Sequence, residues 1–418
     1  MTISELYSIF QKYPYISTDS RLITKNSLFF ALKGKKFNGN EFAKKAIEKG
    51  CCYAIVDEHK YANHSSIILV EDVLETLQKL AKHHREKLTI PIIGITGTNG
   101  KTTSKELIHN VLNSELNCYA TKGNLNNHIG VPLSILEIQD NHDIAIIEMG
   151  ANHSKEIDLL CSIAKPTHGV ITNIGKAHLQ GFKNFQGVVE AKNELFSYIK
   201  EDGGSIFINN DDSLLVKLSR NIKKVSYGVN SSFSTSISSN TPFIYVKWKD
   251  TIIKSKLIGD YQLYNISLAL CIGDYFDIPK KKSQFAVESY VPTNNRSEIR
   301  NTEKNGVIMD AYNANPSSMK AMLESFAKQD YKNKLCILGD MLELGNYSNK
   351  EHNKIIELCK KLNLDSLFVG EEFSKSSKES FKNISDLKEF IKQHPINNKK
   401  ILLKGSRGIR LEKLIEYL

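Results

Sequence analysis

The chain has 418 residues, of which 41% are hydrophobic and 24% charged, with 24 Gly, 9 Pro and 7 Cys. This length allows two to three domains with cores of their own, and the composition excludes collagen, extended disorder, a coiled coil and a small disulfide-stapled fold. The net charge of +10 favours phosphate-bearing partners, whether nucleotides, nucleic acids or anionic lipids, and does not choose among them.

No apolar run approaches the roughly 18 to 20 residues of a membrane helix, so we expect no membrane insertion. The first residues, MTISELYSIF, carry Glu5 and lack the basic start and apolar core of a signal peptide, which predicts a cytoplasmic location. The cysteines form no CxxC spacing, and Cys51 and Cys52 belong to an apolar segment. We therefore expect all of them to be reduced.

The first predicted unit is a small α/β domain over residues 1–88. Its strands are indicated by NSLFFAL, CYAIVDE and SIILVED, and its helices by NEFAKKAIEKG and VLETLQKLAKHHREK. The last of these helices ends in charged residues just before an apolar strand begins, which places the domain boundary there.

A second domain is predicted over residues 89–291. Strands alternate with helices, which indicates a parallel sheet covered by helices, and the strand segments are IPIIGIT, DIAIIEMG, HGVITNIG and GSIFINND. Between Val225 and Leu257 the pattern changes to short Ser/Thr-rich and period-two stretches, from which we expect an antiparallel appendage.

A third α/β domain is predicted over residues 292–418, with strands over GVIMDAY, KLCILGDM, SLFVG and KKILLKGS. The Lys-rich stretch near its end, KSSKESFKNISDLKEFIKQHPINNKK, also carries Glu and Asp and has few aromatic residues. This mixture favours a solvated surface over a nucleic-acid patch, so we expect no nucleic-acid partner.

The strongest motif is ITGTNGKTTSKELI, in which an apolar strand runs into a Gly-rich turn and then into a helix. Such a turn directs backbone N–H groups and the positive end of the helix toward a phosphate. Lys101 would neutralise the β- and γ-phosphates and Thr102 would bind Mg²⁺. Ile95 stands where the general pattern GxxxxGK[ST] has its first Gly, so the loop is a shorter variant. The predicted phosphate-binding residues are Gly97, Thr98, Asn99, Gly100, Lys101, Thr102 and Thr103.

Two further residues are candidates for the same site. Glu148 ends the strand DIAIIEMG, and His178 follows the strand HGVITNIG. Ligands of parallel sheets usually bind at the carboxyl ends of strands, where a carboxylate and an imidazole could complete a Mg²⁺ site. Taken singly, each would be read as a helix cap or a loop residue, and only their placement after the phosphate loop favours function.

Together and in order, several segments resemble the Mur ligases: GTNGKTT, GNLNNHIGVPLSIL, EMGANHSKEI, ITNIGKAHLQGF, EAKNELF, DAYNANPSSMKAML, LGDMLELG and LLKGSRG. The resemblance implies an α/β protein of three domains. A small N-terminal domain holds a UDP-sugar, a central parallel-sheet P-loop domain is the ATPase, and a Rossmann-like C-terminal domain closes over ATP.

Within the family, the segments are most similar to the enzymes that join D-Ala-D-Ala to UDP-N-acetylmuramoyl-tripeptide in peptidoglycan precursor synthesis. This implies ATP and Mg²⁺ as cofactors and an acyl-phosphate intermediate, which the amine of D-Ala-D-Ala opens to an amide. We expect these two substrates as partners and a monomeric protein. The sequence leaves open whether the third residue of the peptide is Lys or diaminopimelate, and it indicates no general base.

The resemblance also assigns roles to residues of the reacting centre. It places Lys101 on the phosphates, Thr102 and Glu148 on a first Mg²⁺, and His178 beside a second metal. Lys192, in EAKNEL, matches a lysine that family members carbamylate, which would turn a cation into an anionic oxygen ligand. The implied catalytic residues are Lys101, His178, Lys192 and Arg296, and the implied metal-binding residues are Thr102, Glu148, His178 and Lys192.

Other matched positions concern the nucleotide and the sugar. The resemblance places Asn127 close to ATP and the metal, Arg296 near the phosphates, and Asn265 with Asp310 and Asn313 on the nucleotide. It places Thr18, Asp19, Ser20 and Arg21 on the UDP-sugar. The chain departs from the family where Asn38, Gly39 and Asn40 replace Asp-Gly-His, and where Asp260, Tyr261 and Gln262 replace a helix start with His and Asn.

Three alternatives remain. Sibling ligases, namely the diaminopimelate or lysine adder and folylpolyglutamate synthase, are disfavoured by NANPSS and by the absence of a DNPR string. A nucleic-acid-dependent NTPase would fit the basic charge and the phosphate loop. A non-catalytic nucleotide-binding module would fit the fold, but Lys101, Glu148, His178 and Lys192 are all present.

Overall fold

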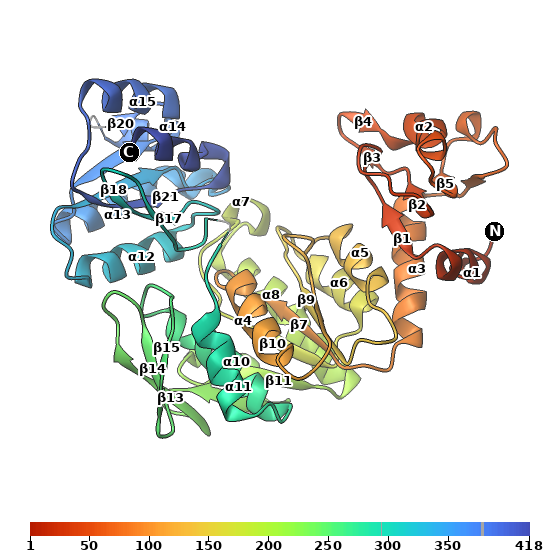
Figure 1. Ribbon diagram of the computed structural model, residues 1–418, viewed down its shortest axis with the longest axis horizontal. Coiled ribbons are helices and arrows are strands. Elements are labelled where there is room, and N and C mark those ends of the chain that lie inside the picture. The colour runs from red at the N-terminus through yellow and green to blue at the C-terminus, as the bar shows by residue number, and fades with distance from the viewer. Residues whose placement is uncertain (294, 378–379) are drawn as a thin grey trace.

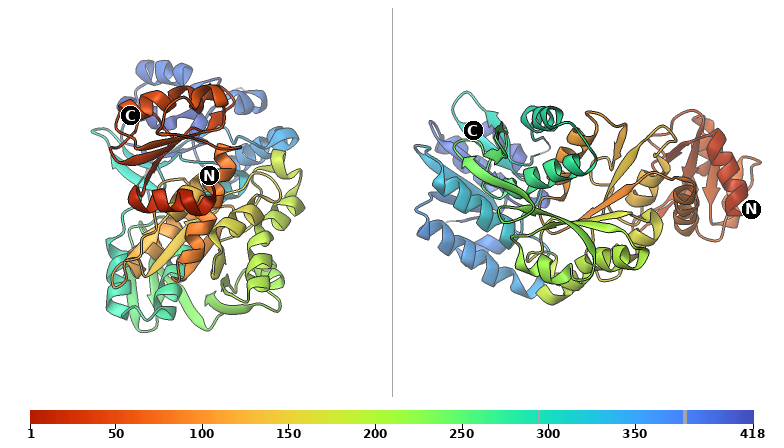
Figure 2. Two further views of the ribbon diagram at one scale, coloured as in Figure 1. Left: turned by 90° about the vertical axis from the view of Figure 1, so that its right-hand side faces the viewer. Right: turned by 90° about the horizontal axis from the view of Figure 1, so that it is seen from below.

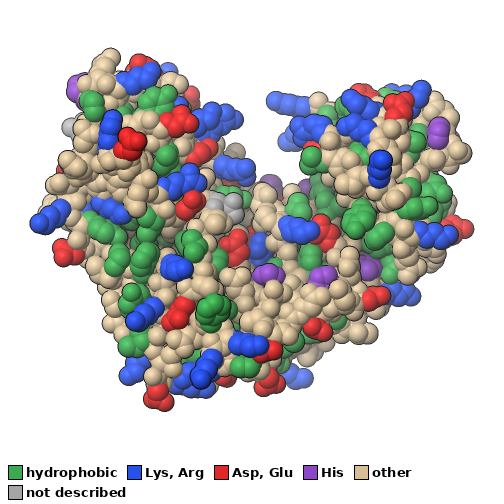
Figure 3. All heavy atoms as spheres, in the orientation of Figure 1, with side chains coloured by type: hydrophobic (Ala, Val, Ile, Leu, Met, Phe, Trp, Pro, Cys, Tyr) green, Lys and Arg blue, Asp and Glu red, His purple; other side chains and the backbone are tan. Residues whose placement is uncertain are grey.

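The computed structural model describes residues 1–293, 295–377 and 380–418, so part of the Lys-rich stretch, residues 378 and 379, lies outside the described residues. Within these residues the strands form three main sheets that follow one another along the chain. The central sheet lies between the other two (Figures 1 and 2), and a hollow separates the N- and C-terminal parts on the face shown in Figure 3. The predicted α/β class is confirmed, and the predicted boundaries at 88/89 and 291/292 lie between the sheets.

The N-terminal sheet has the strand order β1-β2-β5-β6 and is parallel. Its first helix, which begins with a capping box between Thr2 and Glu5, and the short strand after it were not predicted from the sequence. Every residue of the central strand β2 is buried. The elements are α1 (Ile3–Lys12), β1 (Tyr15–Ser17), β2 (Ser27–Phe30), β3 (Lys33–Gly34), β4 (Phe37–Asn38), η1 (Gly39–Phe42), α2 (Ala43–Glu48), β5 (Tyr53–Val56), η2 (His59–Tyr61), β6 (Ile67–Leu69) and α3 (Val73–Lys87).

Helix α3 attaches this sheet to the central domain. The buried guanidinium of Arg85 donates hydrogen bonds to the carbonyl oxygens of Ala164 at 2.9 Å, Lys165 at 3.0 Å and Leu88 at 2.7 Å. Because a buried charged group left without partners would be costly, these bonds fix α3 against the end of a central-domain helix.

The central sheet has the order β15-β14-β13-β12-β11-β10-β7-β9-β8. Helices α4, α10 and α11 pack on one face, and α5, α6 and α8 on the other. The strands are β7 (Ile92–Thr96), β8 (Cys118–Ala120), β9 (Ile144–Glu148), β10 (His168–Ile171), β11 (Ser205–Asn209), β12 (Lys223–Gly228), β13 (Phe233–Ser239), β14 (Tyr245–Trp248) and β15 (Thr251–Lys254). The helices are α4 (Lys101–Leu112), α5 (Gly130–Leu136), α6 (Glu156–Ala164), α7 (Leu179–Phe182), α8 (Phe185–Asp202), α9 (Ser213–Leu218), α10 (Gln262–Tyr275) and α11 (Lys280–Ser289).

The prediction of an antiparallel appendage was only partly right. Strands β13, β14 and β15 pair antiparallel, but β12 pairs parallel with β11 and with β13, so the segment continues the central sheet. This continuation gives hydrogen-bond partners to the edge of the parallel sheet, which would otherwise be bare.

The C-terminal sheet has the order β16-β17-β21-β18-β19-β20, in which β16 pairs antiparallel with β17 and the other strands pair parallel. The strands are β16 (Glu298–Asn301), β17 (Gly306–Asp310), β18 (Lys334–Gly339), β19 (Ser366–Val369), β20 (Ser380–Phe381) and β21 (Lys400–Lys404). The helices are α12 (Pro316–Lys328), η3 (Gly345–Tyr347), α13 (Ser348–Lys361), α14 (Glu371–Ser376), α15 (Ile384–Gln393), η4 (Arg407–Ile409) and η5 (Leu411–Tyr417).

The C-terminal domain rests on the central domain at both ends of α12. These hydrogen bonds join Asn315 to Asn99 (2.7 Å), Lys176 to Ser317 (3.2 Å), Lys328 to Asp260 (2.8 Å) and Gln329 to Asn240 (2.6 Å). The first two contacts lie beside the phosphate loop, so the domain interface forms part of the wall of the site. Across the described residues, no helix is both long and apolar enough to cross a membrane.

Candidate active site

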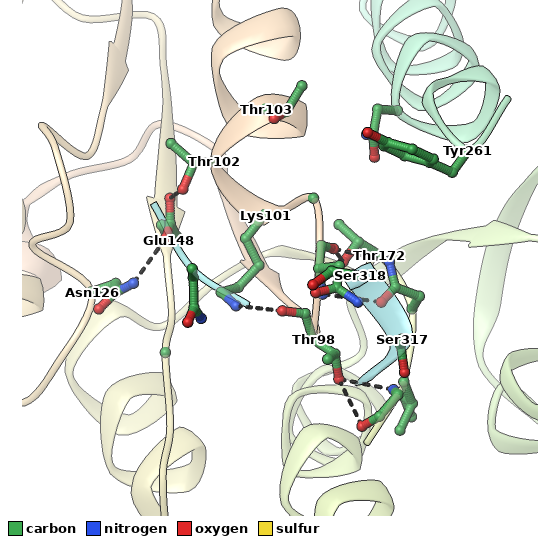
Figure 4. A pocket seen from close by; sticks show the side chains of 18 of the residues that line it. Thr98, Lys101, Thr102, Thr103, Asn126, Glu148, Thr172, Tyr261, Ser317 and Ser318 are labelled. Atoms are coloured by element: carbon green, nitrogen blue, oxygen red, sulfur yellow. Dashed lines mark hydrogen bonds between the residues drawn. The ribbon is translucent and has the colours of Figure 1, made fainter. Parts of the chain in front are cut away.

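A cavity of about 920 Å³ opens where the carboxyl ends of the central strands face the C-terminal domain. Loops after β7, β9, β10 and β11 line one side, and residues after β17 with the start of α12 line the other. Figure 4 shows side chains from both domains pointing into this space. The lining includes these predicted residues: Thr98, Asn99, Gly100, Lys101, Thr102, Thr103, Asn127, Glu148, His178, Asn265, Arg296, Asp310 and Asn313.

The predicted strand, Gly-rich turn and helix are all present around the phosphate loop. Strand β7 is fully buried and α4 begins directly at Lys101. Gly97 and Gly100 adopt φ angles of 142° and 78°, which side chains rarely allow. Neither glycine has room for a methyl group, because a Cβ would meet Thr172 at Gly97 and Asn265 at Gly100.

Lys101 lies across the mouth of the loop. Its Nζ donates hydrogen bonds to the carbonyl oxygens of Gly97 at 2.7 Å and Thr98 at 3.3 Å (Figure 4). Burial of the ammonium lowers its pKa, while the carboxylate of Glu148 opposes this shift. The loop therefore holds the Lys101 amino group at the edge of the cavity, where an anionic group could contact it.

Glu148 is a buried carboxylate with polar neighbours on several sides. It accepts hydrogen bonds from Thr102 at 3.0 Å and from Asn126 at 2.8 Å, and Lys105 lies 3.3 Å away (Figure 4). Burial favours the protonated acid, but Lys105, Lys101, the hydrogen bond from Asn126 and Arg296 together outweigh it and hold the pKa below its usual value. Glu148 is therefore ionised at neutral pH.

Lys105 and Asn126 were missed in the sequence analysis. Lys105 follows Thr102 by three residues on α4, which places both on the same face of the helix. That spacing was the available signal for Lys105. Asn126 lies in a loop, and only the packing of that loop against the end of β9 brings it to Glu148.

Lys192 lies in the interior beside the cavity. It is 2% exposed on α8, and its Nζ lies 5.8 Å from the ring centre of Phe182. Burial, with a smaller contribution from Lys101, lowers the pKa of Lys192 to about 7. A large fraction of the side chain is therefore the neutral amine at neutral pH.

His178 stands directly before the short helix α7 and adopts a left-handed φ of 51°. Its Nδ1 contacts a carboxylate oxygen of Glu343, which comes from the C-terminal domain. The ring also packs edge-on against Phe182. Glu343 was not among the predicted site residues, because nothing in the local sequence links it to His178.

Three of the predicted metal ligands, Thr102, Glu148 and His178, line the cavity, whereas Lys192 is not part of its lining. Thr102 and Glu148 are hydrogen-bonded to each other, while His178 and Lys192 both contact the ring of Phe182. The described part of the chain contains no group of three or more His, Cys, Asp or Glu side chains that could hold a metal by themselves. A Mg²⁺ ion here would need oxygen ligands from phosphates and water as well.

The residues predicted to contact the nucleotide reach the cavity from both domains. Asn265 accepts a hydrogen bond from Ser104 at 2.9 Å and packs against Gly100. Asp310 is bonded to the buried Lys404 at 2.5 Å. The guanidinium of Arg296 stacks on the ring of Tyr312, with 3.6 Å between Cζ and the ring centre.

The residues predicted to bind a UDP-sugar are not among the lining of this cavity. Thr18, Asp19, Ser20 and Arg21 follow β1 in the N-terminal domain (Figure 1). The guanidinium of Arg21 forms a two-point contact with Asp19 and lowers the pKa of that carboxyl to about 2. The Arg21 side chain is otherwise exposed.

The two departures from the family pattern have structural roles. Asn40 is fully buried; its side chain donates to Asn38 at 2.9 Å and to Asp57 at 2.8 Å, and accepts from the Asp57 backbone at 2.9 Å. Asp260 accepts hydrogen bonds from Asn240 at 2.9 Å and from Lys328 of the C-terminal domain. Asn40 thus joins segments within the N-terminal domain, and Asp260 joins the central domain to the C-terminal domain.

Three protein-family models match successive parts of the chain. "Mur ligase family, catalytic domain" matches residues 12–85, "Mur ligase middle domain" matches residues 95–273, and "Mur ligase, glutamate ligase domain" matches residues 295–407. Together the matched segments reach from the N-terminal sheet to the loop after β21.

Relatives and solved structures match nearly the whole chain. The UDP-N-acetylmuramoyl-tripeptide–D-alanyl-D-alanine ligase of Bacillus subtilis is 33% identical over 96% of this chain and 92% of its own. That of Rickettsia prowazekii is 32% identical over 96% and 94%. A crystal structure of MurF from Acinetobacter baumannii superposes with a TM-score of 0.88 at 27% identity, covering 99% of this chain and 98% of its own. MurF from Thermotoga maritima in complex with ADP gives 0.84 at 26%, covering 96% of each.

Proposed function

The chain belongs to the Mur ligase family, and from this premise we propose that it joins D-Ala-D-Ala to UDP-N-acetylmuramoyl-tripeptide in a reaction driven by ATP. Relatives that match almost the whole chain carry this reaction in their names. The observation that carries the proposal is the group of Lys101, Thr102 and Glu148 in a cavity lined by two domains. The product would be a UDP-linked pentapeptide, a precursor of peptidoglycan.

The chemistry takes two steps. A carboxylate oxygen of the tripeptide attacks the γ-phosphorus of ATP, the bond to ADP breaks, and an acyl phosphate forms. The amine of D-Ala-D-Ala then attacks the acyl carbon, inorganic phosphate leaves, and the nitrogen loses a proton. Because water would hydrolyse the acyl phosphate, a cavity enclosed between two domains suits this sequence of steps.

The residues around Glu148 fit a Mg²⁺ ion. An ionised, buried carboxylate beside a hydroxyl offers the hard oxygen ligands that Mg²⁺ prefers together with phosphate oxygens. We assign Thr102 and Glu148 to one cation and His178 and Lys192 to the neighbourhood of a second. Bound Mg²⁺ would neutralise phosphate charge during transfer.

Lys192 suits the second position only after carbamylation. As an ammonium it would repel a cation, but a pKa of about 7 leaves much of it as the neutral amine. The neutral amine can attack CO₂; a nitrogen–carbon bond forms, one proton is released, and an anionic carbamate results. Its oxygens are ligands of the kind that Mg²⁺ takes.

We propose that two positively charged side chains act on the transferred phosphate. Lys101 lies at the phosphate loop, and we assign it to the β- and γ-phosphates. Arg296 enters the cavity from the segment that leads into the C-terminal domain, and its guanidinium stacks on the ring of Tyr312. We assign it to the charge that develops on the transferred group. The proposed nucleotide contacts are Asn127, Asn265, Asp310 and Asn313.

We assign the UDP-sugar to the N-terminal domain. Thr18, Asp19, Ser20 and Arg21 lie in the loop after β1, outside the lining of the cavity. The UDP end would be bound there while the peptide end reaches the γ-phosphate. We further propose that the protein works as a monomer in the cytoplasm, which sedimentation and cell fractionation would test.

One assay tests the reaction. Purified protein is given ATP, Mg²⁺ and UDP-N-acetylmuramoyl-tripeptide, with either Lys or diaminopimelate as third residue, with and without D-Ala-D-Ala. Phosphate release and a pentapeptide product by mass spectrometry, both dependent on the dipeptide, are expected. No ADP with either tripeptide would refute the assignment. ATP turnover stimulated by DNA or RNA, with steep salt dependence, would favour a nucleic-acid-dependent NTPase.

A further inference from the structure

His178 and Glu343 meet across the interface between the central and C-terminal domains. Nδ1 of His178 contacts a carboxylate oxygen of Glu343. The backbones of the two segments are also bonded, because the Gln180 N–H donates a hydrogen bond to the Glu343 carbonyl oxygen at 3.2 Å. The loop that carries His178 is thus held by the domain opposite it.

Both residues adopt a backbone conformation that side chains disfavour. The φ angle is 51° at His178 and 63° at Glu343. A left-handed conformation is uncommon for residues other than Gly, Asn, Asp and His, so it is the more unusual at Glu343. From these backbone positions the two side chains meet across the domain interface.

Stability does not account for this arrangement. The Glu343 side chain is 55% exposed and that of His178 is 25% exposed. Ion pairs with this exposure contribute little to the free energy of unfolding. The contact therefore has another role.

The ring of His178 offers a nitrogen on each side. Its Nδ1 is taken by Glu343, and the residue also lines the cavity, so Nε2 is left for a ligand there. A histidine that binds a metal usually gives its other ring N–H to a carboxylate or carbonyl, which sets its tautomer and orientation. Glu343 supplies that carboxylate from the C-terminal domain.

We propose that Glu343 is a positioning residue for His178. It would orient the His178 ring for binding a metal ion only when the C-terminal domain is docked. The proposal rests on the role assigned to His178 under the proposed function. Docking would then complete the metal site and the enclosed cavity in the same movement, so ATP would not be activated while the cavity is open to water.

The test measures metal binding directly. Mn²⁺, whose free form is counted by electron paramagnetic resonance, is titrated into the full-length protein with ADP and UDP-N-acetylmuramoyl-tripeptide present. The variants are Glu343→Gln, Glu343→Gly, His178→Ala and the double variant His178→Ala/Glu343→Gln. Glu371→Gln, an exposed carboxylate on α14 of the same domain, is the matched control.

Glu343→Gln and Glu343→Gly are each expected to weaken one Mn²⁺ site about 10- to 100-fold. The double variant should bind no more weakly than His178→Ala, because Glu343 acts through His178. Glu343→Gly should keep its melting temperature, since Gly adopts the left-handed conformation without strain. In turnover, kcat should fall while KM for the UDP-tripeptide stays unchanged.

Two results would overturn the proposal: wild-type Mn²⁺ affinity in Glu343→Gln, or effects of the single variants that simply add. Wild-type Mn²⁺ affinity in His178→Ala would also overturn it, by removing the role of His178. That failure is separate from failure of the proposed function, because pentapeptide formation by the unaltered protein is read independently.

Discussion

Glu148 carries its charge in the interior of the central domain, and two lysines of the phosphate loop and its helix make this possible. Lys105 lies 3.3 Å from the carboxylate and also donates to the carbonyl oxygen of Gly123 at 3.1 Å. Both Glu148 and Lys105 are almost fully buried. The local charges are thus arranged before any phosphate or cation arrives.

Removing Lys105 should leave a buried carboxylate with too little positive charge around it. Lys105→Met is expected to lower the free energy of unfolding by about 3 to 5 kcal/mol, the usual effect of breaking a buried ion pair. Urea denaturation measures this value. The double variant Lys105→Met/Glu148→Gln should recover much of the loss, and a double variant as unstable as the single one would contradict the explanation.

Replacing Lys101 should affect catalysis without affecting the sugar substrate. Lys101→Ala is expected to reduce kcat by at least about 100-fold, because the side chain proposed to stabilise the transferred charge is lost. Binding of UDP-tripeptide, measured by calorimetry, should stay near normal, since its proposed residues lie in the N-terminal domain. Loss of that binding in Lys101→Ala would contradict the separation of the two sites.

Burial of Lys192 should make stability depend on pH. Its pKa is about 7 in the folded protein and ~10.4 in the unfolded chain. Below pH 7, Lys192 is charged in both the folded and the unfolded protein, and the folded state bears the full free-energy cost of a buried ammonium. From pH 7 upward the folded state releases its proton first, so stability rises until about pH 10.4.

The measurement compares the wild type with Lys192→Met in buffers free of CO₂. The free-energy difference between the two proteins should change in favour of the wild type from pH 7 upward. A difference independent of pH would show that Lys192 titrates at its ordinary value.

Among the secondary-structure elements, the site depends on a strand and a helix joined by a turn that only glycine fits. Gly100 adopts a φ of 78° and packs against Asn265 of α10. Helix α4 therefore starts where α10 supports it, and its first turn faces the cavity. The contact makes the shape of the loop depend on the packing of two helices.

Alanine at Gly100 should impair nucleotide binding, whereas alanine at Gly203 should not. Gly203 follows α8 with nearly the same φ of 76°, but no atom lies within 4 Å of the point that an alanine Cβ would occupy there. Both variants should lose about 1 to 2 kcal/mol of stability through the left-handed backbone. Only Gly100→Ala should also weaken ATP binding by calorimetry, by at least about tenfold. Equal ATP affinities in the two variants would contradict a role for the Asn265 contact.

In the molecule as a whole, the site lies between two domains that several polar contacts join. The C-terminal domain contacts the central domain through polar side chains at both ends of α12. Interfaces of this kind permit relative motion of domains. Substrate entry and enclosure of the acyl phosphate both need such motion.

Asp260→Ala should loosen this interface without unfolding the protein. Asp260 bonds both Asn240 and Lys328, but the pair is partly exposed, so the loss of stability should stay below about 1 kcal/mol. Small-angle X-ray scattering should show a larger radius of gyration. Glu324→Ala, which breaks an ion pair within α12, is the control and should leave the radius unchanged.

The sequence predicted the phosphate loop and most strands because those features depend on neighbouring residues. A buried strand, a Gly-rich turn and a helix start stand together in ITGTNGKTTSKELI, and the structure has them in that order. Patterns of this kind are weaker in short elements, which is why β1, β3, β4, β8, β16 and β20 were missed. The parallel pairing of β12 was missed for a different reason, since register depends on the whole sheet.

The α/β class, the family, and the residue types available for phosphate chemistry can therefore all be derived from the order of amino acids. The meeting of distant residues cannot: Lys105 and Asn126 reach Glu148, and Glu343 reaches His178, only in the folded chain. The physical reason is that such contacts depend on how several elements pack together. No local pattern of charge or hydrophobicity encodes a contact between two domains.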